Sequence, residues 1–205
     1  MTGWQLFLAG GPLMWPILGC GILACALALE RFGYLRRAGS AGRETLARVF
    51  DQVKRNQIKE AVQTCEKHAY PVTRVLKAGI LKYDRPRSQV KEALEDAAQQ
   101  EIPKLERSLP LLVTLAHIAP LVGLLGTTAG MISCFYAIHG AAAAGHAVST
   151  ADLAGGIWQA LLTTCAGLIV AIPAYAAYNY LVSRVDGLIT EMEQASVELV
   201  NSLSE

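Results

Sequence analysis

The chain has 205 residues, of which 53% are hydrophobic and 17% charged, and its formal net charge is +1. The charge is unevenly spread, because residues 1–29, 108–151 and 153–183 contain no Lys, Arg, Asp or Glu. Since a transmembrane helix needs only ~20 consecutive apolar residues, this pattern excludes an ordinary soluble protein. The sequence shows no phosphate-binding glycine loop, nucleophile elbow, zinc spacing or disulfide framework, so we expect no enzymatic activity, cofactor or metal.

Three membrane spans are predicted, at about Pro12 to Leu29, Leu109 to Ile138 and Leu153 to Leu181. No basic residues precede the first span and it has no small-x-small cleavage pattern, so we interpret it as an uncleaved anchor. Of the 18 Lys and Arg residues, 17 lie between Arg31 and Arg107, and the last is Arg184. Because basic residues near spans are retained in the cytoplasm, we expect the N-terminus outside and the C-terminus inside.

The chain is therefore predicted to be an all-α membrane protein with a helical cytoplasmic domain. Its expected parts are the N-terminus with the first span (1–30), the cytoplasmic domain (31–107), the second span (108–139), an outer loop (140–152), the third span (153–183) and a cytoplasmic C-terminal helix (184–205). The cytoplasmic domain holds 17 basic and ten acidic residues. Next to two spans, this surplus of seven positive charges favours contact with anionic lipid over nucleic-acid binding.

Helical patterns within the cytoplasmic domain predict helices over residues 41–53, 58–68 and 72–83. With Ser88 as the N-cap, a single helix is expected from Gln89 to Ile138, bent at Pro103 and Pro110. At 1.5 Å per residue this helix would measure roughly 75 Å, more than twice the hydrocarbon thickness. Two of the three transmembrane helices are thus expected to extend into the cytoplasm.

One face of each of the last two spans is lined by small side chains. At about 100° per residue, Thr127 and Thr164 lie at the centres of these faces. The other members are Ala116, Pro120, Gly123, Gly130 and Cys134 on the second span, and Ile157, Ala160, Gly167, Ala171, Tyr175 and Tyr178 on the third. Two interpretations of these faces are open. Small residues allow close helix packing in lipid, so the first is helix packing alone. The hydroxyl groups favour the alternative, packing together with a narrow and weakly polar pore.

Two longer segments resemble a known family. Residues 119–132, APLVGLLGTTAGMI, and residues 156–174, GIWQALLTTCAGLIVAIPA, are similar to the second and third spans of the MotA/TolQ/ExbB proton-channel proteins. Glu30-Arg31 after the first span also fits this family. Three spans with an outside N-terminus resemble its ExbB and TolQ branches.

The resemblance implies a homopentamer around a central pore in a bacterial inner membrane. It also implies that a dimer of an ExbD- or TolR-like single-span protein occupies the pore, with a TonB- or TolA-like protein as a further partner. Such a machine uses the proton motive force to energise outer-membrane transport or envelope processes. The alternative is a non-conducting membrane scaffold that holds a single-span partner.

The resemblance also implies roles for individual residues. Thr127 and Thr164 match the threonines that line the family's proton path, and Thr163 and Gln159 are neighbouring candidates for pore lining. The expected packing residues of the pore face are Gly123, Gly130, Ala160 and Gly167. Glu30 and Arg31 are candidates for the cytoplasmic exit of the proton path.

Gln159 departs from the family pattern, because many ExbB and TolQ proteins have a glutamate there. Gln and Thr side chains cannot store a proton near neutral pH, so the family's aspartate on the partner helix would have to carry it. On an ideal helix, at 100° per residue, Gln159 lies about 140° from Thr164. Gln159 could therefore face a seam between subunits instead of the pore lumen. His117, an ionisable side chain in the second span, is interpreted as a hydrogen-bonded packing residue.

Overall fold

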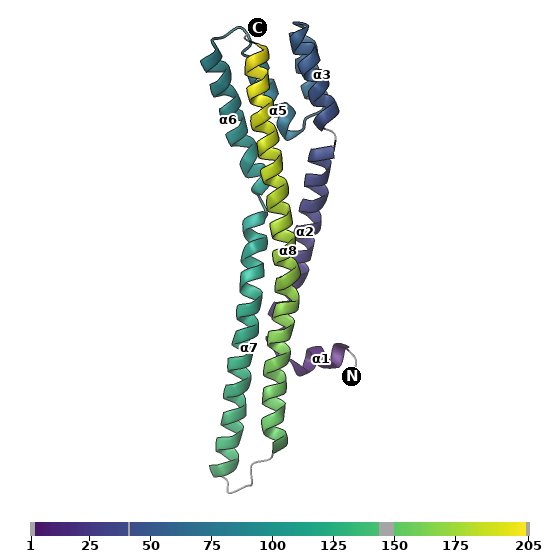
Figure 1. Cartoon of the computed structure of the whole chain (residues 1–205). Helices are drawn as coiled ribbons and strands as arrows, with labels where there is room; N and C mark the ends of the chain where they lie inside the picture. The colour runs from purple at the N-terminus through teal and green to yellow at the C-terminus, as the bar shows by residue number, and fades with distance from the viewer. Residues whose placement is uncertain (1–2, 41, 144–149, 204–205) are drawn as a thin grey trace. The chain divides into compact units, whose positions relative to one another are not determined.

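The computed structural model describes residues 3–40, 42–143 and 150–203, and Figure 1 shows that they form helices joined by short connections. The helices are α1 (Gly3–Ala9), α2 (Met14–Ser40), α3 (Gly42–Lys54), α4 (Ile58–Lys67), α5 (Pro71–Ile80), α6 (Arg87–Glu106), α7 (Leu109–Ala143) and α8 (Thr150–Ser202). The all-α prediction is confirmed.

Three regions of the described chain are long and apolar enough to cross a membrane, at Met14–Gly39, Arg87–Ala141 and Leu153–Ser202. They contain the second and third predicted spans and all but the first two residues, Pro12 and Leu13, of the first. The described chain is therefore that of a multi-pass membrane protein, and the second and third of these regions are much longer than the ~20 residues that one crossing requires.

The chain forms two compact units, described separately below. The first unit comprises Met1–Leu29 and Pro110–Asn179, and the second comprises Glu30–Leu109 and Tyr180–Glu205. All uncharged runs of the sequence lie mainly in the first unit, whereas the Lys and Arg residues lie in the second. Helices α2 and α8 each contribute residues to both units.

The second unit has a core of large aliphatic side chains. Helix α5 packs against α3, α4 and α6, and its Val75, Leu76 and Ile80 have no exposed surface. The C-terminal part of α8 completes this core, because a methyl group at Gly79 of α5 would lie 2.6 Å from Leu94 of α6 and 3.1 Å from Leu199 of α8. Burial of apolar surface, at roughly 25 cal/mol per Å², is the main stabilising term here.

The helix starts in the second unit follow from its prolines. Helix α5 begins at Pro71, where the missing N–H costs nothing, after Tyr70 in an extended conformation. Helix α6 begins at Arg87, with Pro86 in the N-cap position and no side-chain capping bond. The predicted N-cap Ser88 is therefore wrong: the fixed φ of Pro86 starts the helix two residues earlier, so Ser88 lies within the first turn.

The long helix predicted from Gln89 to Ile138 is interrupted at Arg107 and Ser108, between α6 and α7. Pro110 explains the position, because it cannot donate a hydrogen bond to the carbonyl of Glu106 and its ring would collide with that carbonyl. Pro103, in contrast, lies inside α6, which continues past it to Glu106. Of the two predicted bends, only the one at Pro110 breaks the helix.

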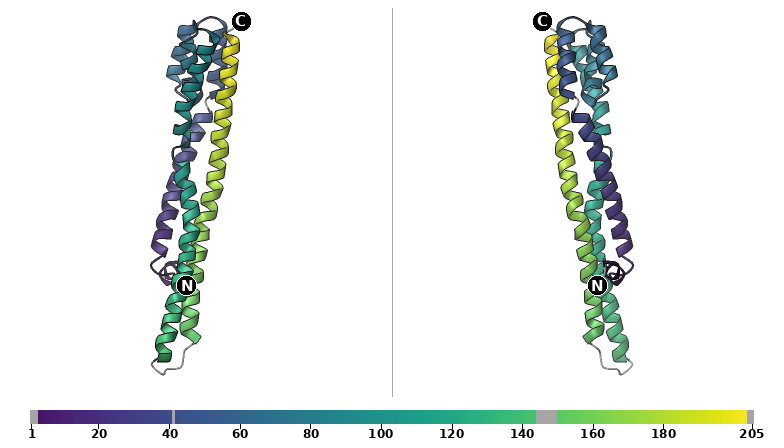
Figure 2. Two further views of the ribbon diagram at one scale, coloured as in Figure 1. Left: turned by 90° about the vertical axis from the view of Figure 1, so that its left-hand side faces the viewer. Right: turned by 90° about the vertical axis from the view of Figure 1, so that its right-hand side faces the viewer.

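The first unit contains α7 and the adjoining half of α8, which lie side by side in both views of Figure 2. It also contains α1, a short helix that the sequence patterns did not predict. Gly11, with a φ of 78°, turns the chain between α1 and α2, a conformation that glycine adopts without strain. The ring of Phe7 stacks on Trp4 at a centroid distance of 5.6 Å and meets Trp15 edge-on at 5.2 Å.

Candidate functional site: the seam between α7 and α8

Helices α7 and α8 meet along a seam of glycine and alanine residues within the first unit. A methyl group at Gly123 would lie 3.0 Å from the Thr163 carbonyl oxygen, and one at Gly167 would lie 2.7 Å from the Ala119 carbonyl oxygen. One turn or more further along, Gly130 lies against Ala160 and Gly156. The backbones are thus so close that even one added carbon would push them apart at several points.

The four residues expected to pack in the pore face, Gly123, Gly130, Ala160 and Gly167, are all buried in this seam. They make contacts between two helices of the same chain. Gly126 also lies in the seam, because a methyl group there would collide with the Thr163 side chain. Its spacing, three residues from Gly123 and four from Gly130, places it on the same helix face and agrees with the close helix contact expected for Gly123-x-x-Gly126 from the sequence.

Thr163 lies differently from a pore-lining group, because none of its surface is exposed. Its hydroxyl donates one hydrogen bond within its own helix, to the Ala160 carbonyl oxygen at 2.8 Å, with the Gln159 carbonyl oxygen at 3.3 Å as a longer second acceptor. The neighbouring side chain, Thr164, points about 100° further round the helix. Thr163 therefore satisfies its hydroxyl inside the seam and offers no polar group at the surface of this chain.

Thr164 and Thr127 lie at the edge of the seam and are both partly exposed. The Thr164 hydroxyl crosses to α7 and donates a hydrogen bond to the Gly123 carbonyl oxygen at 3.2 Å. The Thr127 hydroxyl donates to the Leu124 carbonyl oxygen at 2.7 Å. Each hydroxyl keeps its oxygen lone pairs available as acceptors. Helix α7 and the adjoining half of α8 are called the hairpin below. The structure thus places two hydroxyls where water or another polar group can reach them from one side of this hairpin.

Gln159 does not lie beside Thr164. A methyl group at Gly11 would collide with the Gln159 amide nitrogen Nε2, so the Gln159 side chain reaches the turn between α1 and α2. This turn belongs to the same unit and the same chain. The position agrees with the angle of about 140° between Gln159 and Thr164, and it gives the amide a neighbour within its own chain.

The candidates for the exit, Glu30 and Arg31, lie in the second unit in different environments. Glu30 is exposed, whereas Arg31 is buried. The Arg31 guanidinium donates to the Lys104 carbonyl oxygen at 3.2 Å and to the Ser108 hydroxyl at 3.0 Å. Because the helix breaks after Glu106, the Lys104 carbonyl lacks a regular helical partner, and a cation there also compensates the negative end of the α6 dipole.

A buried carboxylate lies on the same helix end. Glu101 of α6 pairs with Arg74 of α5 and with Lys104, each at 2.7 Å between nitrogen and oxygen. Both cations are partly exposed, so they can remain hydrated while they neutralise the buried Glu101. Arg31 and Glu101 thus tie the end of α6 to α2 and α5, which is a structural role.

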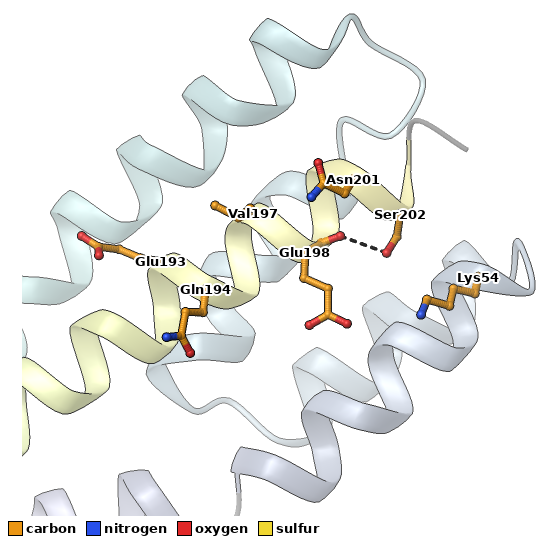
Figure 3. A pocket seen from close by; sticks show the side chains of 7 residues that line it. All are labelled: Lys54, Glu193, Gln194, Val197, Glu198, Asn201 and Ser202. Atoms are coloured by element: carbon orange, nitrogen blue, oxygen red, sulfur yellow. Dashed lines mark hydrogen bonds between the residues drawn. The ribbon is translucent and has the colours of Figure 1, made fainter.

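The second unit also has an open hollow of about 500 Å³ between α3 and α8, which Figure 3 shows from close by. Its lining residues are Lys54, Glu193, Gln194, Val197, Glu198, Asn201 and Ser202. The Ser202 hydroxyl donates to the backbone oxygen of Glu198 at 2.9 Å. This mixture of opposite charges and amides is that of a hydrated groove, and among the described residues no group of three His, Cys, Asp or Glu side chains could hold a metal.

Comparison with known proteins covers most of the chain, including the seam. Residues 45–194 match the family model described as the MotA/TolQ/ExbB proton channel family. This match includes all of α7 and the part of α8 that forms the seam. The transmembrane threonines, the seam glycines and Gln159 thus all lie within the matched region.

Individual proteins agree with this match. A putative biopolymer transport protein ExbB homolog of Methanothermobacter thermautotrophicus is 30% identical over 190 residues, which cover 92% of this chain and 66% of that protein. A putative ExbB-like protein of Synechocystis is 31% identical over 198 residues, covering 94% and 92%. The Tol-Pal system protein TolQ of Haemophilus influenzae is 39% identical over 108 residues, covering 51% and 46%. The chain thus spans nearly all of one relative and smaller parts of the other two.

Proposed function

The chain belongs to the MotA/TolQ/ExbB proton channel family, and on this basis we propose that it forms the proton path of a membrane motor that uses the proton motive force. The motor would energise transport across the outer membrane or another process of the cell envelope. The observation that carries this proposal is the pair of accessible hydroxyls, Thr127 and Thr164, at the edge of a tightly packed and uncharged helix pair.

The proposal requires several copies of the chain, because one hairpin supplies only part of a channel wall. Large apolar side chains are exposed on both helices of the hairpin, at Leu121, Leu124, Leu125, Ile132, Phe135, Leu161, Ile169 and Ile172. Such surfaces need lipid or neighbouring subunits around them. We infer that the chains form a ring, with a homopentamer as the proposed assembly, and that the threonine edges face its lumen.

The proton carrier in this proposal belongs to a partner. Residues 108–183 contain one carboxylate in the sequence, Asp152, which falls between the two uncharged runs. Hydroxyls and the Gln159 amide can orient water or a carboxyl group, but they do not titrate near neutral pH. Family membership implies ExbD/TolR-type partners. We propose that a dimer of such a single-span protein enters the ring, carries the proton on its carboxylate, and works with a TonB- or TolA-like protein.

The proposed orientation rests on the distribution of charge, and the proposed location rests on the family. With 17 of the 18 basic residues between Arg31 and Arg107, we propose that the second unit faces the cytoplasm and that the N-terminus and the 140–152 loop face the outside. The proposed location is a bacterial inner membrane. Glu30, exposed at the start of the second unit, remains the candidate for the cytoplasmic exit, and Arg31 supports it by fixing the adjacent backbone.

Proton flux in liposomes tests this function. The chain is reconstituted with the ExbD/TolR-type protein that co-purifies with it, a pH gradient is imposed, and a dye reports internal pH. We expect flux that falls at least about tenfold in Thr164→Val, because the variant keeps the shape of the side chain and removes the hydroxyl. Thr190→Val on the same helix is the matched control, since Thr190 is exposed in the second unit and bonds only its own helix.

Two outcomes would contradict the proposal. Absence of flux in the unmodified complex, with intact assembly by size-exclusion chromatography, would favour the alternative of a non-conducting scaffold for a single-span partner. Replacement of Glu by Gln at position 159 relative to many family members is the observation behind that alternative. Equal flux with and without the partner would show that the chain conducts alone, which would refute the assignment of the carrier to the partner.

A further inference from the structure

An ionisable side chain of the first unit has no role in the function above. His117 lies on α7, ten residues after Arg107 and ten before Thr127. The sequence favoured a hydrogen-bonded packing residue, but the structure leaves His117 exposed. The seam at this level is filled by the small buried side chains Ala116, Ala119 and Ala171. His117 therefore does not fill the space between the two helices, and its exposure needs another explanation.

Tyr175 of α8 lies beside His117. The two ring centroids are 5.7 Å apart and the ring planes are inclined by 49°. Tyr175 is itself 46% exposed and has Tyr178 as its next ring neighbour, at 6.2 Å. The contact restricts rotation of the imidazole and holds it at the edge of the hairpin. Two residues that are 58 positions apart in the sequence are thus brought together by the pairing of α7 with α8.

The pair lies on the same side of the hairpin as the threonine hydroxyls. On an ideal helix Tyr175 lies about 20° from Thr164, and His117 lies about 80° from Thr127. Along the helix, Tyr175 is roughly 17 Å from Thr164, in the direction of Arg184. Along α7 the imidazole therefore lies between the level of the threonines and the start of the helix at Leu109, and along α8 Tyr175 lies between Thr164 and Arg184.

The exposure of the His117 imidazole within a membrane span has an energetic consequence. An imidazole facing hydrocarbon would leave two ring nitrogens without hydrogen-bond partners, which costs several kcal/mol in a membrane. Ionisable side chains within spans accordingly face a water-filled cavity or another polar surface, and they commonly take part in proton relays. The exposed edge that carries His117 is thus expected to face the interior of the assembly and not lipid.

We propose that His117, oriented by Tyr175, is a proton-transfer residue on the part of the path between the threonines and the proposed cytoplasmic exit. The proposal rests on the function proposed above. A ring nitrogen of neutral His117 accepts the proton of the partner's carboxylic acid, which leaves a carboxylate and an imidazolium. The imidazolium then gives a proton to water on the side of Arg107 and Arg184, and the imidazole returns to its neutral form.

Few other titratable groups face this imidazole within the first unit. Tyr175 and Tyr178 are the ones on α8. The portion of α2 in this unit, residues 14–29, contributes only the thiols of Cys20 and Cys25 and has no Lys, Arg, Asp, Glu or His. A change of flux between pH 5 and 8 that depends on His117 would therefore report the imidazole or the partner's carboxylate.

The experiment measures proton flux against pH, from 5 to 8.5, in liposomes that contain the chain and its co-purified ExbD/TolR-type protein. We expect His117→Gln to lower flux by about tenfold or more and to flatten its pH dependence, because an amide keeps the size and polarity but cannot carry a proton. His139→Gln is the matched control, since His139 is also exposed on α7 but lies on the other side of Thr127. It should retain the flux and the pH profile of the unmodified complex.

Two further measurements distinguish a role of His117 in proton transfer from a structural role: rescue of flux by free imidazole, and substitution of Tyr175. Free imidazole should restore part of the flux in His117→Ala, which a purely structural defect would not allow. Tyr175→Phe keeps the ring contact and should retain flux within about twofold, whereas Tyr175→Ala should lower it and shift the pH profile. Size-exclusion chromatography verifies assembly of each variant.

The two proposals can fail separately. Robust flux in the unmodified complex, with the same magnitude and pH profile in His117→Gln, would refute the role of His117 and leave the channel function intact. Failure of imidazole to rescue an assembled but inactive His117→Ala would also refute it. Absence of flux in the unmodified complex would refute the channel function and the role of His117 together.

Discussion

The helices within each of the two units pack through a different kind of side chain. In the first unit α7 and α8 approach through glycine, alanine and threonine, whereas in the second unit α5, α6 and α8 interlock through leucine, isoleucine and valine. Lipid is as apolar as leucine, so large side chains gain little by leaving it, and helices in a membrane associate by close backbone contact and hydrogen bonds. In water, burial of large apolar surface supplies the driving force.

The two units also differ in whether their polar side chains are accessible or take part in structural contacts. In the first unit the small side chains of the seam leave polar groups at its edge, where Thr127, Thr164 and His117 are accessible. In the second unit the polar groups at the end of α6 are occupied by structural bonds, as the contacts of Arg31 and Glu101 show. We therefore expect changes in the second unit to act mainly on stability, and changes at the seam edge to act mainly on flux.

The largest effect on stability is expected from loss of volume in the second unit. Leu76→Ala should cost about 2–5 kcal/mol of unfolding free energy, because Leu76 of α5 has no exposed surface and its truncation leaves a cavity in the core of the second unit. Denaturant titration of the purified protein in detergent, followed by circular dichroism, measures the change. Leu81→Ala is the control, since Leu81 is 58% exposed, and it should change stability by less than about 0.5 kcal/mol. Equal effects in the two variants would refute the assigned core.

A smaller effect is expected from added volume in the first unit. Gly167→Ala should destabilise the hairpin by about 1–3 kcal/mol, because the new methyl group would lie 2.7 Å from the Ala119 carbonyl oxygen and a backbone atom cannot rotate away. Unfolding in mixed micelles with increasing SDS measures it. Gly155→Ala on the same helix meets no atom within 4 Å, so it should be neutral or slightly stabilising. A tolerated methyl group at position 167 would mean that the helices are less closely packed than described.

The smallest effect concerns Cys65, which is buried in the second unit. Burial raises the pKa of the Cys65 thiol from 9.0 to about 11, with smaller opposing influences from Lys77, which lowers it, and Glu66, which raises it. The folded state thus disfavours the thiolate, so the stability linked to this group is fully present below pH 9 and is lost as the pH rises through 11. Carbamidomethylation by iodoacetamide at pH 8 should be about a hundredfold slower than in denaturant.

A variant that retains Cys65 as its sole cysteine makes this rate measurable, and its unfolding between pH 8 and 11 gives the stability change. The variant with alanine at position 65 should lack that pH-dependent contribution. Fast alkylation of the folded protein at pH 8 would show that α4 opens readily and that Cys65 is not a fixed part of the core. It would also mean that the core of the second unit is less rigidly packed than the comparison of the two units assumes.

How much of the candidate site was predictable varied from residue to residue. The positions of Gly123, Gly130, Ala160 and Gly167 on one face followed from helical periodicity, because small residues at that spacing can serve only close contact or a cavity. The periodicity placed Thr164 on this face and not Thr163, whereas the family resemblance made both neighbours candidates for pore lining. The exact rotation of α8 against α7 buries one hydroxyl and leaves the other at the edge.

The sequence by itself determined the class of the protein, its three spans and its two regions of different charge. These properties follow from hydropathy, helical periodicity and prolines, which act within one or two turns of a single helix. Only the tertiary structure decided that Gln159 reaches the turn at Gly11, that Arg31 is buried beneath the end of α6, and that His117 meets Tyr175. These contacts join residues far apart in the chain, and they depend on how helices are placed against one another, which no local pattern specifies.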